Sequence, residues 1–166
     1  MGKIEKIVCD AGPFIHLQEI QQVSLLQISK RVLTTEEILE ECRVIRKIIE
    51  GQEYIQKKDL TSQSKNFAKY ILEQYDLDLG ECTGIALCRQ EEIKLFFTDD
   101  LEAREVAKKL GLEPHGTLAI IMRALREKIL TKQEAKKCMH YLYTQGTLFF
   151  TKELLDWTMK EIGMFR

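Results

Sequence analysis

Short apolar stretches alternate with longer amphipathic ones along the chain, and this alternation predicts strands separated by helices. The stretches 4–9, 31–34 and 93–97 have the length and apolar content of buried strands. Residues 51–61 are polar and irregular, and the tight connection at 111–116 has room for a short strand. Such alternation is typical of a parallel sheet covered on both faces, so we predict an α/β fold. We expect helices at about 12–23, 36–49, 62–75, within 76–88, at 100–110, 118–126 and 131–143, and a final strand and helix within 148–163.

The length and even composition of the chain favour a single domain. Its 166 residues are enough to bury a sizeable core. No internal repeat, low-complexity tract or linker divides them. We therefore expect residues 1–166 to form one domain.

Charge and cysteine content narrow the classes of function. The formal net charge of −1 removes the argument from a globally basic, nucleic-acid-binding chain, but it leaves room for a local basic patch. The five cysteines include no C-x-x-C pair, so neither a zinc site nor a disulfide framework is indicated. No apolar run approaches the ~20 residues of a membrane span. The N-terminal sequence MGKIEKIVCD lacks the apolar core of a signal peptide, so we expect a cytoplasmic protein.

Three aspartates stand where predicted strands end. Asp10 follows the strand 4–9, and Asp99 and Asp100 follow the strand 93–97. Ligands of open parallel sheets bind beyond the carboxyl ends of the strands. If the two strands are neighbours, the carboxylates converge, and their repulsion favours a bound Mg²⁺ or Mn²⁺. Each aspartate also has a simpler explanation as a helix cap, and Asp99-x-x-Glu102 fits a capping box.

Two glutamates are further candidates. Glu41 lies three residues after Ile38 on an apolar stripe of isoleucines, where a carboxylate is costly unless it has a partner or reaches water at the edge of the stripe. Glu81 begins a helix of small residues, where it either faces the site or only interacts with the helix dipole. Asp78-x-x-Glu81 fits a second capping box.

Thr98 and Arg104 complete the set of candidates around the aspartates. Thr98 precedes them and offers a supporting hydroxyl. Arg104 lies four residues after Asp100, so it either forms an ordinary surface pair with it or orients the acids and touches a phosphate. Four more basic residues are candidates for phosphate contacts, or are simply surface residues: Lys108, Lys109, Arg123 and Arg126.

The order of these motifs resembles the PIN-domain family, and more closely its VapC-like branch of small prokaryotic ribonucleases. IVCDAGPFIHL is similar to the opening strand, acid and helix of the family, and EEILEEC to its V-x-x-E-L segment. LDLGECTGIALC resembles the L-D-x-G-E-x-x-A-I-x-L-A motif of the branch. FFTDDLEAREVAKKLGL, HGTLAII and the C-terminal LYTQGTLFFTKELLDWTMKEIG continue the likeness over nearly the whole chain. The sequence departs from the branch at Thr35, Gly84 and Ala119, where proline, alanine and glycine are usual.

The resemblance implies a fold, a site and an activity. The fold would be a three-layer α/β/α sandwich around a mostly parallel sheet. The acids Asp10, Glu41, Glu81 and one of the pair Asp99 and Asp100 would form the catalytic site. Asp10, Glu81 and that pair would hold Mg²⁺ or Mn²⁺, and RNA would be hydrolysed. By association the resemblance also implies a toxin with an antitoxin partner, and a homodimer.

Two other functions stay open at the level of sequence. A non-catalytic PIN-like module would bind RNA or a protein partner without cleaving anything, and the near-neutral charge and the altered G-T-L-A segment are compatible with it. A metal-dependent phosphohydrolase would act on a small phosphate ester. The first strand is followed by D-A-G and not by the D-x-D that such an enzyme would use as its nucleophile, so this alternative ranks last.

Overall fold

A five-stranded sheet forms the centre of the molecule in the computed structural model, which describes residues 2–165. The strand order is β3-β2-β1-β4-β5, and every neighbouring pair is parallel. In the central strand, Val8 lies opposite Leu33 of β2 on one side and opposite Phe96 of β4 on the other. The strands are β1 (Ile4–Cys9), β2 (Ser29–Thr34), β3 (Ile55–Lys57), β4 (Leu95–Phe97) and β5 (Glu113–His115).

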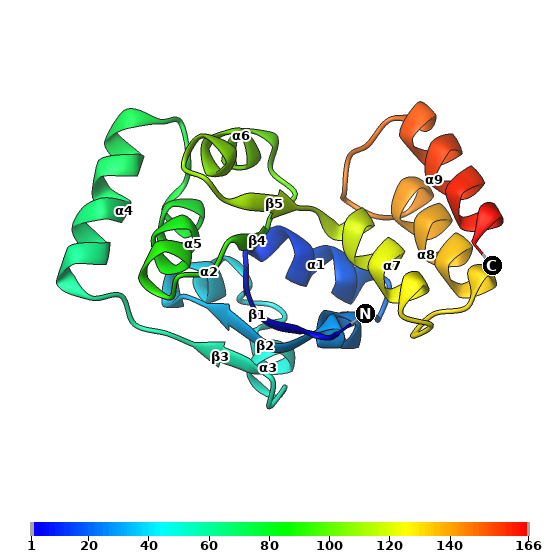
Figure 1. Cartoon of the computed structure of the whole chain (residues 1–166), viewed down its shortest axis with the longest axis horizontal. Helices are drawn as coiled ribbons and strands as arrows, with labels where there is room; N and C mark the ends of the chain where they lie inside the picture. The colour runs from blue at the N-terminus through cyan, green and yellow to red at the C-terminus, as the bar shows by residue number, and fades with distance from the viewer. Residues whose placement is uncertain (1, 166) are drawn as a thin grey trace.

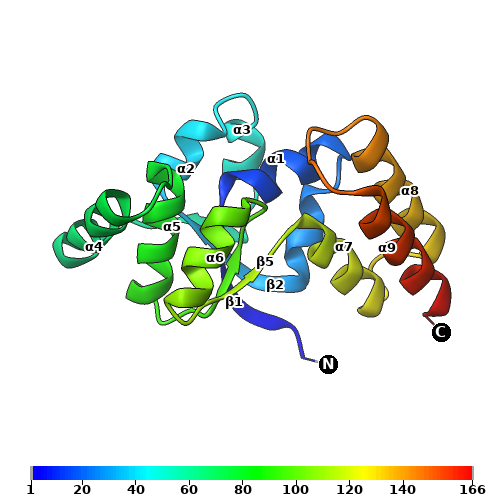
Figure 2. The same ribbon diagram turned by 90° about the horizontal axis from the view of Figure 1, so that it is seen from above.

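Helices cover both faces of the sheet. Side chains of a strand alternate between the two faces, so each central strand contributes apolar residues to two cores. Ile7 and Cys9 face one core together with Phe14 of α1 and Ile120 of α7. Val8 faces a second core with Ile85 of α5. Helix α4 packs on the outside of α5 (Figures 1 and 2). The helices are α1 (Ala11–Glu19), the 3₁₀ helix η1 (Val23–Ile28), α2 (Glu36–Glu41), α3 (Arg46–Glu50), α4 (Ser62–Gln74), α5 (Leu79–Gln90), α6 (Leu101–Lys109), α7 (Thr117–Arg126), α8 (Lys132–Thr144) and α9 (Lys152–Met164). The predicted three-layer α/β/α architecture is confirmed.

The topology brings the predicted acids to one edge of the sheet. Strands β1 and β4 are neighbours, and the backbone N–H of Asp10 donates to the carbonyl of Phe97 over 2.8 Å. Parallel strands end at the same edge, so Asp10 and the segment Thr98–Asp100 emerge side by side. The strands that precede Asp10 and Asp99 are therefore neighbours, which the site expected from the sequence required.

The predicted helix 36–49 is broken, and that prediction was wrong. Helix α2 ends at Glu41 and α3 begins at Arg46. The break folds the chain back so that Arg46 contacts Glu36, ten residues earlier, over 2.6 Å. A straight helix would hold those residues about 15 Å apart along its axis. The isoleucine stripe does not survive the break, because Ile38 is buried whereas Ile48 is 41% exposed.

Several boundaries also differ from the predictions. The polar segment 51–61 contains the edge strand β3, which pairs with β2 and packs one apolar side chain, Ile55, against the core. The first helix ends at Glu19, and the 3₁₀ helix η1 follows. The strand predicted at the beginning of 148–163 is absent from the described chain, since residues 148–150 form a loop in which Phe150 is buried and Phe149 is 91% exposed.

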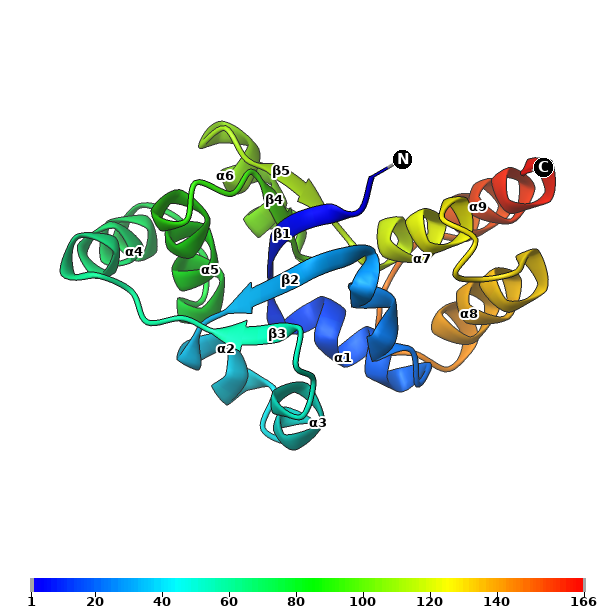
Figure 3. The ribbon, with the colours of Figure 1, turned by 60° about the horizontal axis from the view of Figure 1, so that its bottom comes forward.

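The C-terminal helices extend away from the sheet. Helices α8 and α9 pack on each other, and α7 connects them to the rest of the molecule (Figures 1 and 3). Within residues 2–165, no helix combines the length and the hydropathy that crossing a membrane requires.

Candidate active site

Asp10 is the most deeply buried acid of the candidate site. Its side chain is only 4% exposed, and the Thr98 hydroxyl donates to its Oδ2 over 2.8 Å. Its Oδ1 is buried without a hydrogen-bond partner among residues 2–165. Asp10 occupies the cap position of α1, yet its side chain makes no capping bond, so the explanation as a helix cap fails. Burial raises the pKa of Asp10 to about 6, against the lowering effect of the Thr98 hydrogen bond.

Asp100 caps helix α6 with one carboxylate oxygen. Its Oδ1 accepts from the backbone N–H of Ala103 over 2.8 Å, and its own N–H donates to the Thr98 hydroxyl over 3.3 Å. The side chain is exposed, and its Oδ2 makes no hydrogen bond within the described chain. Thr98 thus links Asp10 to Asp100 through two hydrogen bonds, and its supporting role at the site stays a prediction.

Asp99 points elsewhere and binds protein groups with both of its oxygens. Oδ1 accepts from the backbone N–H of Thr117 over 2.7 Å. Oδ2 contacts the Thr117 hydroxyl over 2.6 Å and Nδ1 of His16 over 2.8 Å. A Cβ on Gly116 would lie 2.7 Å from Oδ1, so glycine is needed for this close approach. Asp99 therefore ties the end of β4 to α1 and to the beginning of α7, and the capping box predicted for it with Glu102 is wrong because Asp100 is the cap.

Two more acids meet at the beginning of helix α5. The predicted capping box of Asp78 and Glu81 is present, with bonds of 2.8 and 2.9 Å. Glu81 is nevertheless 7% exposed, and burial raises its pKa to about 8, with the charges of Asp78, Asp10 and Asp100 adding to the shift. It therefore both caps the helix and faces the other acids.

Glu41 reaches the same place from the end of α2. Its carboxylate lies so close to Gly80 that a Cβ there would be 2.0 Å from its Oε1. Although the residue as a whole is exposed, desolvation of this carboxylate and the charges of Asp78 and Asp10 raise its pKa. Glu41 thus belongs to the acid cluster, and the glycine before Glu81 makes its approach possible.

The pKa shifts identify one acid that the sequence analysis treated only as a cap. The charge of Asp78 raises the pKa of Asp10, of Glu41 and of Glu81. Asp78 is exposed, and it caps the helix that carries Glu81. Its position three residues before Glu81, within D-L-D-L-G-E, was the available signal.

Arg104 does not pair with Asp100, contrary to the surface-pair explanation. No ion pair of this arginine is found within residues 2–165, and its Nη1 would lie 3.4 Å from a Cβ on Gly116. It instead lines a cavity beside Asp99. The alternative role, contact with a phosphate, stays a prediction.

The donor set suits a hard divalent cation, although the carboxylates do not form a finished binding site. Among residues 2–165, no group of three or more His, Cys, Asp and Glu side chains is arranged to hold a metal ion. Like charges separate carboxylates unless a cation lies between them. The free, buried Oδ1 of Asp10 and the raised pKa of Glu81 are features that a bound Mg²⁺ or Mn²⁺ would satisfy, since both prefer oxygen ligands.

Comparison with known proteins settles the family. The family model described as DUF3368, PIN domain, matches residues 6–164. The chain belongs to the PIN-domain family. Its structure is also similar to the crystal structure of VapC20 of Mycobacterium tuberculosis, described as a toxin that cleaves the sarcin-ricin loop, with a TM-score of 0.50 and 17% identity over 60% of this chain and 94% of that one. No curated protein matches the sequence.

Membership in the PIN-domain family confirms the predicted resemblance to that family. Two of the departures from the motifs of the VapC-like branch have structural compensations. Thr35 caps α2 with its side chain and contacts the hydroxyl of Thr83 over 2.8 Å. Gly84 leaves space for the ring of Phe96, which a Cβ there would approach to 2.8 Å. Neither change displaces a candidate acid.

Proposed function

We propose that this PIN-domain protein is a divalent-metal-dependent endoribonuclease that hydrolyses phosphodiester bonds of RNA. One observation carries the proposal. Asp10 is buried with an unpartnered carboxylate oxygen at the shared edge of β1 and β4, next to the charges of Glu81 and Asp78. A folded protein keeps such a costly arrangement at a functional site more often than elsewhere.

Asp10, Glu81 and Asp100 would hold Mg²⁺ or Mn²⁺. The cation would supply positive charge that activates water and stabilises the charge developing on the phosphate. Thr98 fixes the orientation of Asp10 through its hydroxyl. Glu41, whose pKa is raised toward neutrality, would accept a proton from the attacking water. Arg104, which lines a cavity together with Asp99, would align the phosphate backbone.

Of the two adjacent aspartates, we assign Asp100 to the metal and a positioning role to Asp99. Asp100 uses one oxygen as a helix cap and keeps the other available. Both oxygens of Asp99 already accept hydrogen bonds from Thr117, and one of them also contacts His16. This assignment chooses between the two residues that the sequence left equivalent.

The test combines metal binding with RNA cleavage on the same protein samples. Calorimetry with Mn²⁺ and Mg²⁺, followed by a cleavage assay in the same buffer, compares the wild type with Asp10→Asn. The matched control is Asp59→Asn, which changes an exposed aspartate outside the cluster. We expect binding and cleavage to disappear together in Asp10→Asn only. Metal-dependent cleavage that persists in Asp10→Asn would refute the site.

A non-catalytic RNA- or protein-binding module is the second candidate. It is favoured by one observation, namely that the acids among residues 2–165 do not converge as a metal-holding group. RNA binding that persists in EDTA, without cleavage in Mn²⁺, would support it. A phosphohydrolase of small phosphate esters ranks below both, because the D-x-D motif is missing after β1.

The biological setting is also a proposal. VapC20 is described as a toxin, and we propose by this likeness that the present protein is the toxin of a toxin–antitoxin pair, inhibited by an antitoxin protein. A homodimer and a cytoplasmic location stay predictions. Co-expression with a candidate antitoxin should abolish growth inhibition, and sedimentation equilibrium measures the oligomeric state.

A further inference from the structure

Helix α8 is packed against the protein on one side and open to solvent on the other. Its buried residues recur every three or four positions and so lie on one side of the helix, where α7 and α9 are its neighbours (Figures 1 and 3). They are Ala135, Cys138, Met139 and Leu142. All other residues of α8 are exposed. Four of them lie close together on the open side, and we call their surface the α8 face: Lys136, Lys137, His140 and Tyr141.

The α8 face carries positive charge that no ion pair within residues 2–165 neutralises. Lys136 and Lys137 are exposed, and neither forms an ion pair in the described chain. Glu134 is the only carboxylate of α8, and its Oε2 accepts from the backbone N–H of Thr131 over 2.8 Å in the capping box at the beginning of the helix. The formal net charge of the whole chain is −1. The α8 face is therefore the kind of local basic patch for which the sequence left room.

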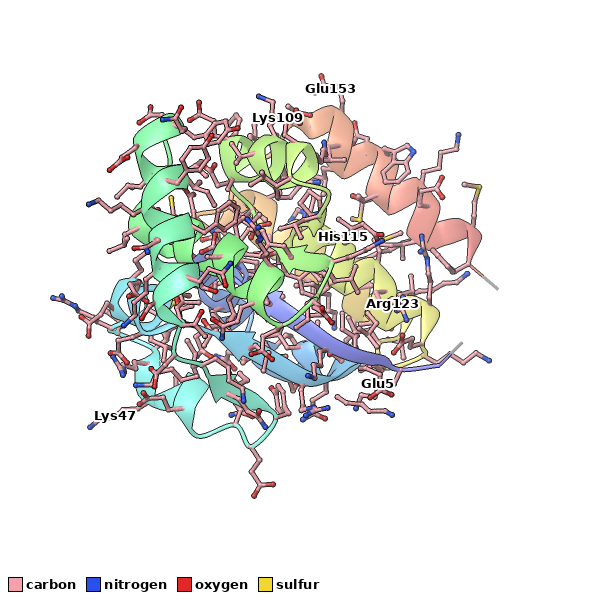
Figure 4. The ribbon with its side chains drawn as sticks, turned by 60° about the vertical axis from the view of Figure 1, so that its left-hand side comes forward. Glu5, Lys47, Lys109, His115, Arg123 and Glu153 are labelled. Atoms are coloured by element: carbon pink, nitrogen blue, oxygen red, sulfur yellow. The ribbon has the colours of Figure 1, made fainter. Side chains whose placement is uncertain are left out.

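Other surfaces of the molecule carry charges of both signs. Figure 4 labels examples on β1, α3, α6 and α9, namely Glu5, Lys47, Lys109 and Glu153. Glu5 pairs with Lys30 of the neighbouring strand, and on α9 the side chains of Lys152 and Asp156 approach to 3.9 Å. The α8 face differs from these surfaces because its charged side chains are all of one sign.

Tyr141 adds an exposed aromatic ring to the lysines. Its side chain is 46% exposed, and no ring contact of it is found among residues 2–165. Tyr143, by contrast, contacts the ring of Phe150, with centroids 5.6 Å apart. Residues four apart on a helix are neighbours, so Lys137 lies beside Tyr141 and Lys136 beside His140. Cations that meet phosphates and a ring on which a base stacks are the groups by which proteins hold a single-stranded nucleic acid.

We propose that the α8 face binds a single-stranded segment of RNA outside the candidate active site. Lys136 and Lys137 contact its phosphates, and a base stacks on Tyr141. His140 offers a ring N–H to the same strand. Each neutralised phosphate releases counterions, so the affinity falls as the salt concentration rises. The inference rests on the proposed function, because it takes RNA as the substrate of this protein.

Helix α1 connects the α8 face to the acid cluster. Asp10 precedes α1, and Glu19 ends it. The carboxylate of Glu19 accepts from the backbone N–H of Thr147 over 3.1 Å, three residues after the end of α8. With nine residues, α1 places its two ends about 13 Å apart along its axis. A bound strand that extends past α1 would thus reach the acids, and the α8 face would hold the substrate without touching the reacting phosphate.

Two other occupants fit the α8 face less well. The buried core of a protein–protein interface is apolar and depleted of lysine, whereas the α8 face has two lysines and no aliphatic side chain. A second copy of the chain in a two-fold arrangement would bring the same lysines together, because an isologous interface uses one surface twice. A polyanion with stacking bases satisfies both the charge and the ring.

The test measures RNA binding by fluorescence anisotropy in EDTA, so that metal chemistry plays no part. The probes are labelled single-stranded oligomers of adenine and of uridine. Lys136→Gln/Lys137→Gln should weaken binding and make the dependence of log affinity on log salt shallower by about 1.4, at roughly 0.7 for each lost phosphate contact. Tyr141→Ala should weaken binding about tenfold. Adenine should bind more tightly than uridine to the wild type, and this difference should disappear in Tyr141→Ala.

Helix α4 provides the matched controls. Lys65, Lys69 and Tyr70 are exposed there, and Glu73 follows Lys69 by one turn. Lys65→Gln/Lys69→Gln changes the net charge equally, and Tyr70→Ala removes an equally exposed ring. Both should bind RNA as the wild type does. In a cleavage assay with Mn²⁺, Lys136→Gln/Lys137→Gln should raise KM for a long oligomer and keep kcat, because the α8 face does not contact the reacting phosphate.

Four outcomes would overturn the proposal. The first is an unchanged affinity and salt dependence in Lys136→Gln/Lys137→Gln. The second is the same loss in the α4 controls, which would reduce binding to net charge. Polyglutamate bound as tightly as RNA would assign the α8 face to an acidic protein, and binding of phosphatidylserine vesicles without RNA would assign it to a membrane surface. Asp10→Asn should bind RNA in EDTA at least as tightly as the wild type. Binding without cleavage in Mn²⁺ would therefore refute the nuclease proposal alone.

Discussion

Substitution of Gly80 by alanine should separate stability from activity in this protein. Gly80 is the second residue of α5, directly before Glu81. A Cβ there would lie 2.0 Å from Oε1 of Glu41 and 2.9 Å from its Cδ, far inside van der Waals contact. The clashing atoms are the end of an exposed, flexible side chain, so Glu41 will swing away while the backbone stays in place.

Gly80→Ala should change the free energy of unfolding and the rate of RNA cleavage in opposite directions. Alanine in a helix is more favourable than glycine by about 0.5–1 kcal/mol, so the free energy of unfolding should rise slightly or stay constant. Displacement of Glu41 would remove the proposed proton acceptor, and such groups contribute roughly 10²–10⁴-fold to rate. We expect metal-dependent cleavage to fall by about two orders of magnitude while the protein remains fully folded.

Urea unfolding and single-turnover RNA cleavage would be measured on Gly80→Ala, on Glu41→Ala and on the double variant. The two losses of activity should not add, because both act through one carboxylate. Gly163→Ala is the matched control, since Gly163 lies in α9 and a Cβ there meets nothing within 4 Å. It should gain the same stability with full activity. Full cleavage by Gly80→Ala, or additive losses in the double variant, would refute the role given to Glu41.

Three further outcomes follow from the site. Burial raises the folded-state pKa of Asp10 from 3.8 to about 6. The folded protein therefore binds this proton more tightly than the unfolded chain, and the resulting gain in the free energy of unfolding is complete below pH ~4 and is lost as pH rises through 6. In EDTA, Asp10→Asn should therefore be more stable than the wild type at pH 8, by up to about 3 kcal/mol in urea unfolding, and an equal or lower stability would contradict the burial argument. Thr98→Val removes the hydroxyl that donates to Asp10 and should lower the free energy of unfolding by about 1–3 kcal/mol. It should also weaken Mn²⁺ binding measured by calorimetry, and an unchanged metal affinity would count against the supporting role of Thr98. Asp100→Asn should lose metal binding with little change in thermal unfolding, whereas Asp99→Asn should lower the unfolding temperature and keep metal binding. The reverse pattern would exchange the roles of the two aspartates.

The central sheet and the position of the acids were predictable because they depend on local patterns. Apolar stretches that end in an acid mark the carboxyl ends of β1 and β4, and the parallel arrangement follows from the alternation of strands with helices. The break between α2 and α3 was not predictable, because helical spacing of isoleucines continues through it. What compensates for the break is the contact of Arg46 with Glu36, which exists only in the folded chain. That residues 1–166 form a single domain stays a prediction.

The pattern of apolar residues mispredicted two segments in opposite ways: it missed the edge strand β3, and it predicted a strand where residues 148–150 form a loop. Strand β3 has a single apolar residue, Ile55, and it forms where the edge of β2 offers backbone hydrogen bonds. The segment Leu148–Phe150 has the composition of a strand, yet no sheet edge among residues 2–165 pairs with it, and it lines a cavity together with residues of β4, α7 and α9. Hydrophobicity therefore identified the burial of Phe150 but not the exposure of Phe149.

The two adjacent aspartates show where sequence reasoning reaches its limit at the site. Asp99 and Asp100 have the same chemistry and neighbouring positions, so no local pattern distinguishes them. The folded chain distinguishes them, because Asp99 contacts His16 and Thr117, which are distant in sequence, whereas Asp100 contacts only its near neighbours Ala103 and Thr98. The chain turns from strand to helix between them, and successive side chains at such a turn point to different parts of the molecule. One aspartate can therefore hold the scaffold while the next remains available to a metal, which explains how two like charges are tolerated side by side.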